Sequence, residues 1–327
     1  MKKAFLIALC LVVAGIAMIA VAAHSQSFDF SKLINAEYVT NRHSVPSTFT
    51  SIAVDVDTAD VVFDHAMSGD CIVECLERDT LIHSVYVEDN TLHVKLEDNR
   101  KWYEKIVLFS FKSPNITIYL PLNNYEKLSA KSDTGDIVVP DNLRFDNAVL
   151  DSDTGDIEFN ADVVSSLKID SDTGDIAIGN RSVDNLNLGG LNVSADTGNI
   201  DIDCVNAGDV RLESDTGNIK LKVGRCSTLI AESGTGNVKI TDFIADGKMT
   251  IDVGTGNVLF TNADAAELEI ETHTGDVEGT LLTPKIFYAH SQTGHVRTPE
   301  SLVGGRCKIT SDTGDIDIRI NSTVAHN

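Results

Sequence analysis

The sequence is poor in basic residues. Lysine and arginine together number 26, against 49 aspartate and glutamate residues, so the 327-residue chain carries a formal net charge of −23 at pH 7. Such an excess of acid repels phosphate backbones and anionic lipid head groups. The composition therefore excludes nucleic-acid binding and polybasic docking onto membranes as main functions.

Aromatic residues and cysteines are also scarce. Aromatics make up 6% of the chain, there is one tryptophan, and the six cysteines form no Cys-x-x-Cys motif. A zinc ribbon or a dithiol redox centre is therefore not indicated. Hydrophobic residues nevertheless reach 42%, which is too many for an acidic disordered tail, so the chain must bury a core.

Long uncharged runs are absent except for one, from Ala4 to Ala23, which follows Lys2 and Lys3. As a helix this run would cross a hydrocarbon core of about 30 Å, whereas its Ala20-Val21-Ala22 end fits a signal cleavage site. Residues 1–23 are thus a signal anchor or a signal peptide. Both alternatives place residues 24–327 outside the cytoplasm, either anchored to the cell membrane or secreted.

A Thr-Gly pair recurs ten times in the part of the chain after residue 130. Neighbouring copies are 19 or 20 residues apart, except that 24 residues separate Gly174 from Gly198. This regularity predicts a repeat architecture. The ten glycines are Gly135, Gly155, Gly174, Gly198, Gly217, Gly236, Gly256, Gly275, Gly294 and Gly314.

Apolar and polar residues alternate on both sides of each glycine, as in strands with one buried face. The apolar positions change parity across the Thr-Gly-Asp sequence, so the chain must bend there. Glycine and aspartate suit such a corner, and no 3.6-residue period appears in the repeats. Because one strand pair cannot bury its own apolar face, successive coils must stack. The sequence therefore predicts an all-β fold, a parallel β-solenoid of about ten coils of 19–20 residues.

Finer features of the solenoid follow from the same alignment. Residues 24–43 form a linker, 44–127 an N-terminal β cap with an eroded coil in which Ala59 replaces the glycine, 128–320 the solenoid and 321–327 a polar tail. The threonines are expected to form an inward hydroxyl ladder, and the long spacing to form an extra loop around Leu188-Gly189-Gly190. The coil with Ile316 and Ile318 is expected to end the rod without a cover, which would leave an open edge.

The N-terminal apolar segment, the Ile-Thr-Ile-Tyr-Leu-Pro stretch at 116–121 and the serial Ser-Asp-Thr-Gly-Asp-Ile repeats resemble an adhesin-like family of bacterial surface β-strand repeat proteins, whose function is unknown. The resemblance covers most of residues 45–320. It implies a bacterial, surface-exposed β-solenoid, and some relatives belong to envelope-stress systems that respond to cell-wall antibiotics. The family offers no catalytic motif to transfer.

Acidic residues occupy two columns beside the corner in the first three coils. At about 4.8 Å between coils, neighbouring carboxylates repel each other by about 1 kcal/mol even in water. Oxygen ligands in an exported protein suit Ca²⁺, although ordinary turn chemistry with solvent and salt screening is the simpler explanation of the columns. The calcium hypothesis rests on Asp133, Asp136, Asp153, Asp156, Asp172 and Asp175.

Three other groups suggest binding chemistry. His273, His290 and His295 fall in coils that follow one another in the sequence, where they could bind zinc or simply relieve a ladder of like charges. Trp102 and Tyr103 lie in a basic, aromatic loop that suits stacking on a glycan or contact with a partner, or packing on the first coil. Cys204 and Cys226 fall in neighbouring coils, so a disulfide between them is open.

The features together predict a non-enzymatic protein without a cofactor other than Ca²⁺. Repeating coils make extended binding surfaces, and the expected partners are a cell-wall polymer, another surface or a membrane protein. A β-helix polysaccharide lyase or hydrolase is an alternative, but its catalysis would need a unique acid–base set in one coil. A third alternative is a structural or signalling subunit. Copies of this chain would then assemble end to end as a homo-oligomer, or the end of the rod would report envelope damage.

Overall fold

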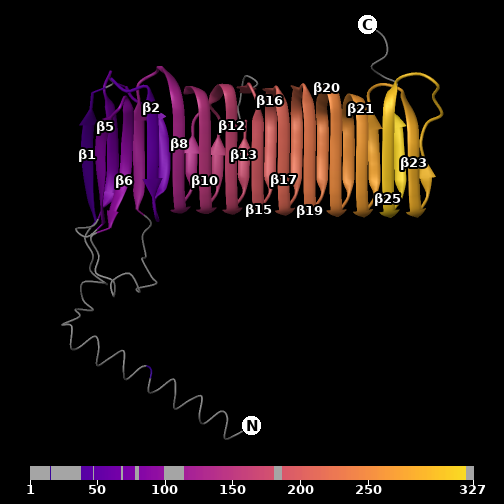
Figure 1. Cartoon of the computed structure of the whole chain (residues 1–327), viewed down its shortest axis with the longest axis horizontal. Coiled ribbons are helices and arrows are strands. Elements are labelled where there is room, and N and C mark those ends of the chain that lie inside the picture. Colours follow the sequence, from indigo (N-terminus) through magenta and orange to yellow (C-terminus); the bar gives the residue numbers. More distant parts are fainter. Residues whose placement is uncertain are drawn as a thin grey trace, which may run out of the picture. The chain divides into compact units, whose positions relative to one another are not determined.

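The computed structural model describes residues 15, 38–46, 48–67, 69–77, 81–98, 114–179 and 186–321. From residue 38 onward all regular elements in these ranges are strands, stacked side by side into one solenoid (Figure 1). The sequence prediction of an all-β solenoid is thereby confirmed. The proposed anchor or signal at 1–23 lies outside the described residues, apart from Gly15. No described helix is long and apolar enough to cross a bilayer.

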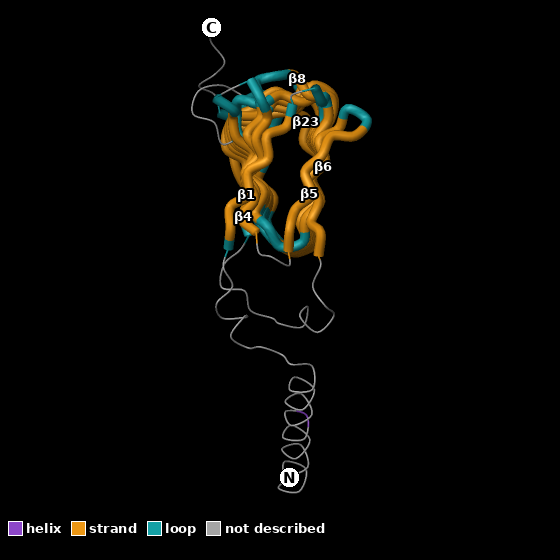
Figure 2. Tube along the Cα trace, turned by 90° about the vertical axis from the view of Figure 1, so that its left-hand side faces the viewer, coloured by secondary structure: helices purple, strands orange, loops and turns teal. Residues whose placement is uncertain are grey.

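Each coil has a first wall before the Thr-Gly corner and a second wall after it, with the interior between them (Figure 2). The first wall contains β2 (Ser51–Val56), β8 (Asn124–Thr134), β10 (Arg144–Thr154), β12 (Asp162–Thr173), β15 (Leu191–Thr197), β17 (Asp209–Thr216), β19 (Thr228–Thr235), β23 (Lys285–Thr293) and β25 (Gly305–Thr313). The second wall contains β3 (Asp60–His65), β9 (Ile137–Val139), β11 (Ile157–Phe159), β13 (Ile176–Ile178), β16 (Ile200–Ala207), β18 (Ile219–Cys226), β22 (Val277–Leu281), β24 (Val296–Arg297) and β26 (Ile316–Ile320).

Two strands, β20 (Val238–Thr255) and β21 (Val258–Thr274), run along the second wall and continue through the return bend onto the first. The short strand β14 (Leu186–Leu188) lies in the return segment of its own coil. Pairing between successive coils is parallel and in register; Leu150, for example, lies between Ala130 and Ile169. The apolar columns read from the sequence therefore superimpose, which buries them continuously along the stack.

The corner needs glycine for two reasons. The φ angle of Gly155 is 146°, and a Cβ there would lie 2.3 Å from the carbonyl oxygen of Gly135 in the preceding coil. A side chain would thus meet the backbone of the neighbouring coil, in a conformation that other residues rarely adopt. All ten corner glycines lie in this one stack, and Ala59 occupies its N-terminal end against Gly135.

The corner threonines do not point inward. All ten are exposed, as Thr154 and Thr173 illustrate, so the expected inward threonine ladder was wrong. The inward hydroxyls belong to the residue two positions earlier: Ser132 Oγ donates to the carbonyl of Ala59, and Ser214 Oγ donates to that of Gly198. Side chains alternate between buried and exposed up to the serine. The aspartate that follows the serine is exposed, and the alternation ends there, so the threonine after it is exposed as well.

The C-terminal coils do not stack in sequence order. Strand β21 pairs with β25, and β25 in turn pairs with β23, so the coil of residues 305–320 lies between two coils that precede it in the chain (Figure 1). Ile316 and Ile318 are consequently buried. The expectation that they would end the rod was wrong, because the coil of β23 and β24 covers them.

The N-terminal end has a similar exchange. Strands β2 and β3 stack on β8 and β9, but on their other side lie β6 (Thr91–Asp98) and β7 (Asn115–Leu120), which follow them in sequence. Three further strands, β1 (Val39–Val45), β4 (Cys71–Glu77) and β5 (Leu81–Glu88), complete this end. There β5 pairs antiparallel with β6, and β4 with β7. Reversed strands over the last parallel coil cover an edge that would otherwise template aggregation.

Candidate functional site

A continuous hydrogen-bond ladder runs along the acidic column after the corner glycines. Asp136 Oδ1 accepts the backbone N–H of Asp156 at 2.8 Å, and Asp156 Oδ1 accepts that of Asp175 at 2.8 Å. In the middle coils asparagines continue the pattern, and Asn218 donates both its backbone N–H and Nδ2 to Asn199 Oδ1. We call this row the corner ladder; its members are Asp60, Asp136, Asp156, Asp175, Asn199, Asn218, Asn237, Asn257, Asp276, Asp315 and His295.

The ladder gives each of its predicted calcium ligands, Asp136, Asp156 and Asp175, a structural partner. One oxygen of each side chain holds a backbone N–H of the next coil. An aspartate and an asparagine both supply that acceptor, so the change to asparagine along the column keeps the contact and removes the charge.

The predicted ligands in the other column, Asp133, Asp153 and Asp172, are exposed on the first wall. Lys131 Nζ lies 3.5 Å from Asp153 Oδ1 and 4.0 Å from Asp133 Oδ1. Among the residues that the structure describes, neither column brings three carboxylates within 4.8 Å of one another. Calcium binding remains a hypothesis beside this structural role.

The histidines are not brought together as expected. The coils of His273 and His290 are separated by the inserted coil of β25, because β25 pairs with β21 on one side and β23 on the other. His295 ends the corner ladder, where its backbone N–H donates to Asp315 Oδ1. Among the described strands no further coil follows it in the stack, so an acceptor side chain is not needed there.

The other residues singled out in the sequence are two aromatic residues and the cysteines. Trp102 and Tyr103 lie outside the described residues. Cys204 and Cys226 carry free thiols, as do Cys71, Cys75 and Cys307. Burial raises the pKa of Cys226 and of Cys307 to about 12, so these two thiols are inert packing groups rather than nucleophiles.

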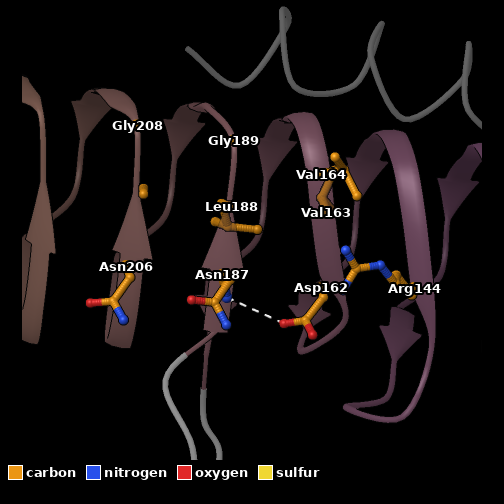
Figure 3. Close-up of a pocket in the computed structure, with 10 residues that line it drawn as sticks. Arg144, Asp162, Val163, Val164, Asn187, Leu188, Gly189, Asn206 and Gly208 are labelled. Atoms are coloured by element: carbon orange, nitrogen blue, oxygen red, sulfur yellow. Dashed lines mark hydrogen bonds between the residues drawn. The ribbon is translucent and has the colours of Figure 1, made fainter.

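An open groove of about 460 Å³ lies along the return segment of four successive coils (Figure 3). Its polar edge is one aligned column: Arg144 of β10 pairs with Asp162 of β12, and Asn187 of β14 pairs with Asn206 of β16. Asp162 Oδ1 accepts the backbone N–H of Asn187 at 3.2 Å, which fixes the two coils at this point.

The apolar side of the groove is made by Val164, which is 49% exposed, and by Leu188. Gly189 and Gly208 allow close packing of the coils beside the groove, since a Cβ on Gly208 would lie 1.9 Å from the carbonyl oxygen of Gly189. The backbones of the two coils thus meet here without side chains between them. Arg144 is exposed and forms no ion pair with any other described residue.

The extra residues of the long coil fall in the chain between Ile178 and Leu186. Ile178 and Leu186 flank them, since these residues pair with Ile202 and Val205 of the next coil. Leu188 pairs with Val163 and belongs to the regular ladder. The loop expected at Leu188-Gly189-Gly190 was therefore misplaced, although the irregular spacing does mark the coil beside which the groove forms.

Known proteins define the family but not the activity. The Toastrack DUF4097 family model matches residues 49–222 and 206–326. This chain belongs to the Toastrack DUF4097 family. Its membership agrees with the adhesin-like resemblance and with a β-solenoid fold. No curated protein matches the chain.

Several solved structures align with most of this chain at low identity. A candidate adhesin of Bacteroides fragilis is 18% identical with a TM-score of 0.38, over 86% of this Toastrack chain and 97% of its own. A candidate lipid-binding protein of Parabacteroides distasonis is 14% identical with a TM-score of 0.44, over 87% and 98%. A candidate adhesin of Parabacteroides merdae is 10% identical with a TM-score of 0.41, over 87% and 97%. At these scores the three structures add nothing to the family match.

Proposed function

We propose that this protein is a non-enzymatic binding scaffold of the bacterial cell surface, in which the groove at Arg144, Asp162, Asn187 and Asn206 attaches a cell-wall polysaccharide. The groove is the observation that carries the proposal. A concave, partly apolar surface with a few polar groups is the usual form of a small-ligand site.

The spacing of the groove favours an extended polymer. Its polar column repeats once per coil, at about 4.8 Å, which is close to the length of one sugar unit in an extended polysaccharide. The exposed guanidinium of Arg144 presents paired donors that suit vicinal hydroxyls, and the exposed face of Val164 offers an apolar contact for a sugar ring. A scaffold that holds a polymer in register needs no catalytic group.

The test is co-sedimentation of the full chain with purified bacterial cell wall. We expect the wild type to bind, and Arg144→Ala and Val164→Glu to weaken binding at least about tenfold, since each removes about 1.4 kcal/mol or more. Arg297→Ala is the matched control, because Arg297 is an exposed arginine outside the groove. Equal binding by all variants would assign attachment to another face, and no binding by the wild type would end the proposal.

A second candidate function, end-to-end assembly, is favoured by the coil of β23 and β24, which ends the described stack. Tyr288 on β23 is 59% exposed and Val296 on β24 is 41% exposed, and β23 pairs with β25 on one side only among the described strands. An unpaired strand edge with exposed apolar side chains can template pairing with another copy. Sedimentation velocity of the wild type against Tyr288→Lys tests it: a concentration-dependent dimer lost in the variant supports assembly.

A further inference from the structure

A cluster of two buried side chains and one half-buried side chain with metal-ligand chemistry lies in the N-terminal cap, away from the groove and the corner ladder. It contains the imidazole of His43, the thiol of Cys75 and the carboxylate of Glu77, whose ligand atoms all lie within 4.8 Å of one another. Cys75 and Glu77 occupy alternate, buried positions of β4, and His43 comes from β1, which pairs with β4. The strands lie at the N-terminal end of the stack (Figure 2).

One ring nitrogen of His43 lacks a hydrogen-bond partner among the described residues, and Glu77 is a buried carboxylate without a described lysine or arginine beside it. The Nε2 atom of His43 is buried and makes no hydrogen bond, and an unsatisfied buried polar atom costs about 1–3 kcal/mol. Glu77 is 3% exposed and contacts no lysine or arginine among the described residues. A buried carboxylate without a cation nearby is likewise unfavourable.

Hydrogen-bonding groups of Asn41 and His83 hold Glu77 in place. Glu77 Oε1 accepts the backbone N–H of His83 at 2.5 Å and lies 3.0 Å from His83 Nδ1, while Oε2 accepts Asn41 Nδ2 at 2.5 Å. His83 belongs to β5, which pairs with β6 in the opposite wall (Figure 2). The carboxylate is therefore fixed from both walls, as carboxylate ligands of metal ions commonly are.

We propose that the cap binds one zinc ion through His43, Cys75 and Glu77. Thiolate and imidazole ligands select zinc over the hard cations calcium and magnesium, which take oxygen ligands. Donors of a tetrahedral zinc site lie about 3.5 Å apart, so separations below 4.8 Å need only side-chain adjustment. The ion gives His43 its missing partner and Glu77 its missing positive charge, while the thiol proton passes to solvent.

Three protein ligands leave a fourth coordination position. His83 serves as a positioning residue, because its backbone and ring contacts fix the orientation of Glu77. The ion would crosslink β1 to β4 and so stabilise the strands that cap the N-terminal end of the solenoid. This site is independent of the polysaccharide groove, and neither requires the other.

The test measures metal binding by the full chain, prepared without a polyhistidine tag, reduced, and stripped by a chelator. Titration with zinc against a chromophoric chelator should show about one equivalent bound. Cys75→Ser and His43→Gln should each raise the dissociation constant at least about 100-fold. Cobalt(II) should give a thiolate charge-transfer band that the Cys75→Ser variant lacks.

The controls separate coordination from folding. Cys226→Ser removes a buried thiol from the solenoid interior and should keep both the equivalent of zinc and the cobalt band. His83→Phe should weaken zinc about 10- to 100-fold, while His83→Gln, which keeps a side-chain N–H, should restore most of the affinity. Circular dichroism of each stripped variant reports its fold. Substoichiometric zinc in the wild type, or unchanged affinity in a folded Cys75→Ser variant, would overturn the proposal.

Discussion

The carboxylate of Asp156 accepts the backbone N–H of Asp175 in the next coil, with Oδ1 and N 2.8 Å apart. The same contact recurs along the corner ladder whether its member is aspartate or asparagine. The acidic columns of this sequence are thus partly a device for holding successive corners in register. The stability of the solenoid therefore depends on this hydrogen bond between coils and on the backbone conformation around it.

Asp156→Ala should lower the free energy of unfolding by about 1 kcal/mol, since it removes one inter-coil hydrogen bond. Asp156→Asn should be close to neutral, because the amide oxygen accepts the same N–H. Chemical denaturation of the two variants measures the difference. His295→Ala is the control, because no described coil donates to His295. If Asn proves as costly as Ala, the charge itself matters and the ladder does not explain the column.

Chelation should leave the melting temperature unchanged. The corner ladder and Lys131 already occupy the carboxylates of the first coils, so a calcium ion is not needed to hold them together. Thermal unfolding is compared in millimolar calcium and in a calcium-selective chelator that leaves zinc in place. A clear upward shift in calcium would instead support a site at the acidic columns.

Gly155→Ala should cost about 2 kcal/mol or more, because it combines a strained φ with a contact to the backbone of Gly135. Gly190→Ala is a matched control in the same solenoid: its nearest atoms would lie 3.7 Å from the added Cβ, and it should shift stability by less than about 0.5 kcal/mol. Urea midpoints of both variants test this. Equal effects would show that the corner tolerates side chains.

Val223→Asn should stabilise the protein by about 1 kcal/mol. Val223 is 45% exposed and has a φ of 43°, a left-handed conformation that disfavours β-branched residues and suits asparagine. Asp242 and Asn262 occupy the equivalent bends of the next two coils with similar angles. Leu259→Asn, at an exposed strand position, should bring no gain. Denaturation midpoints decide between strain relief and a general effect of polarity.

Acid should selectively weaken the contribution of Glu269. Hydrogen bonds from Lys248 at 2.6 Å and Lys308 at 3.0 Å lower the pKa of this carboxyl to about 2. Its folded pKa is below the unfolded value of about 4.3, so the stabilisation is present above pH 4.3 and is lost as the pH falls toward 2. Because these side chains are 35% to 44% exposed, the effect should stay below about 1 kcal/mol.

The measurement for Glu269 compares Glu269→Gln with the wild type by denaturation between pH 7 and pH 2.5. The stability difference should shrink as the pH falls, since protonation removes the same charge that the substitution removes. Glu271→Gln, which forms no ion pair among the described residues, should show no such dependence. A difference that stays constant with pH would attribute the effect to packing.

The repeat unit, the corner glycine and the all-β solenoid can be read from the residues alone. These follow from local rules: alternation fixes which side chains are buried, as with Leu150 and Ile169, and the glycine is required wherever one corner packs on another. The same rules misjudged the threonines, because the point at which a chain leaves the buried register depends on the turn geometry. The irregular spacing pointed to the coil of the groove, but not to Arg144 or Asn206 in it.

The order of the coils, and the side chains that this order brings together, depend on long-range strand pairing. All coils share one pattern, so no residue pattern can show that β25 inserts between β21 and β23, or that β2 lies between β6 and β8. The juxtaposition of His43 with Cys75 likewise arises from pairing of distant strands. Local periodicity specifies the structure of one coil. Because all coils have the same local pattern, only their long-range packing determines which coils become neighbours, and therefore which functional side chains meet.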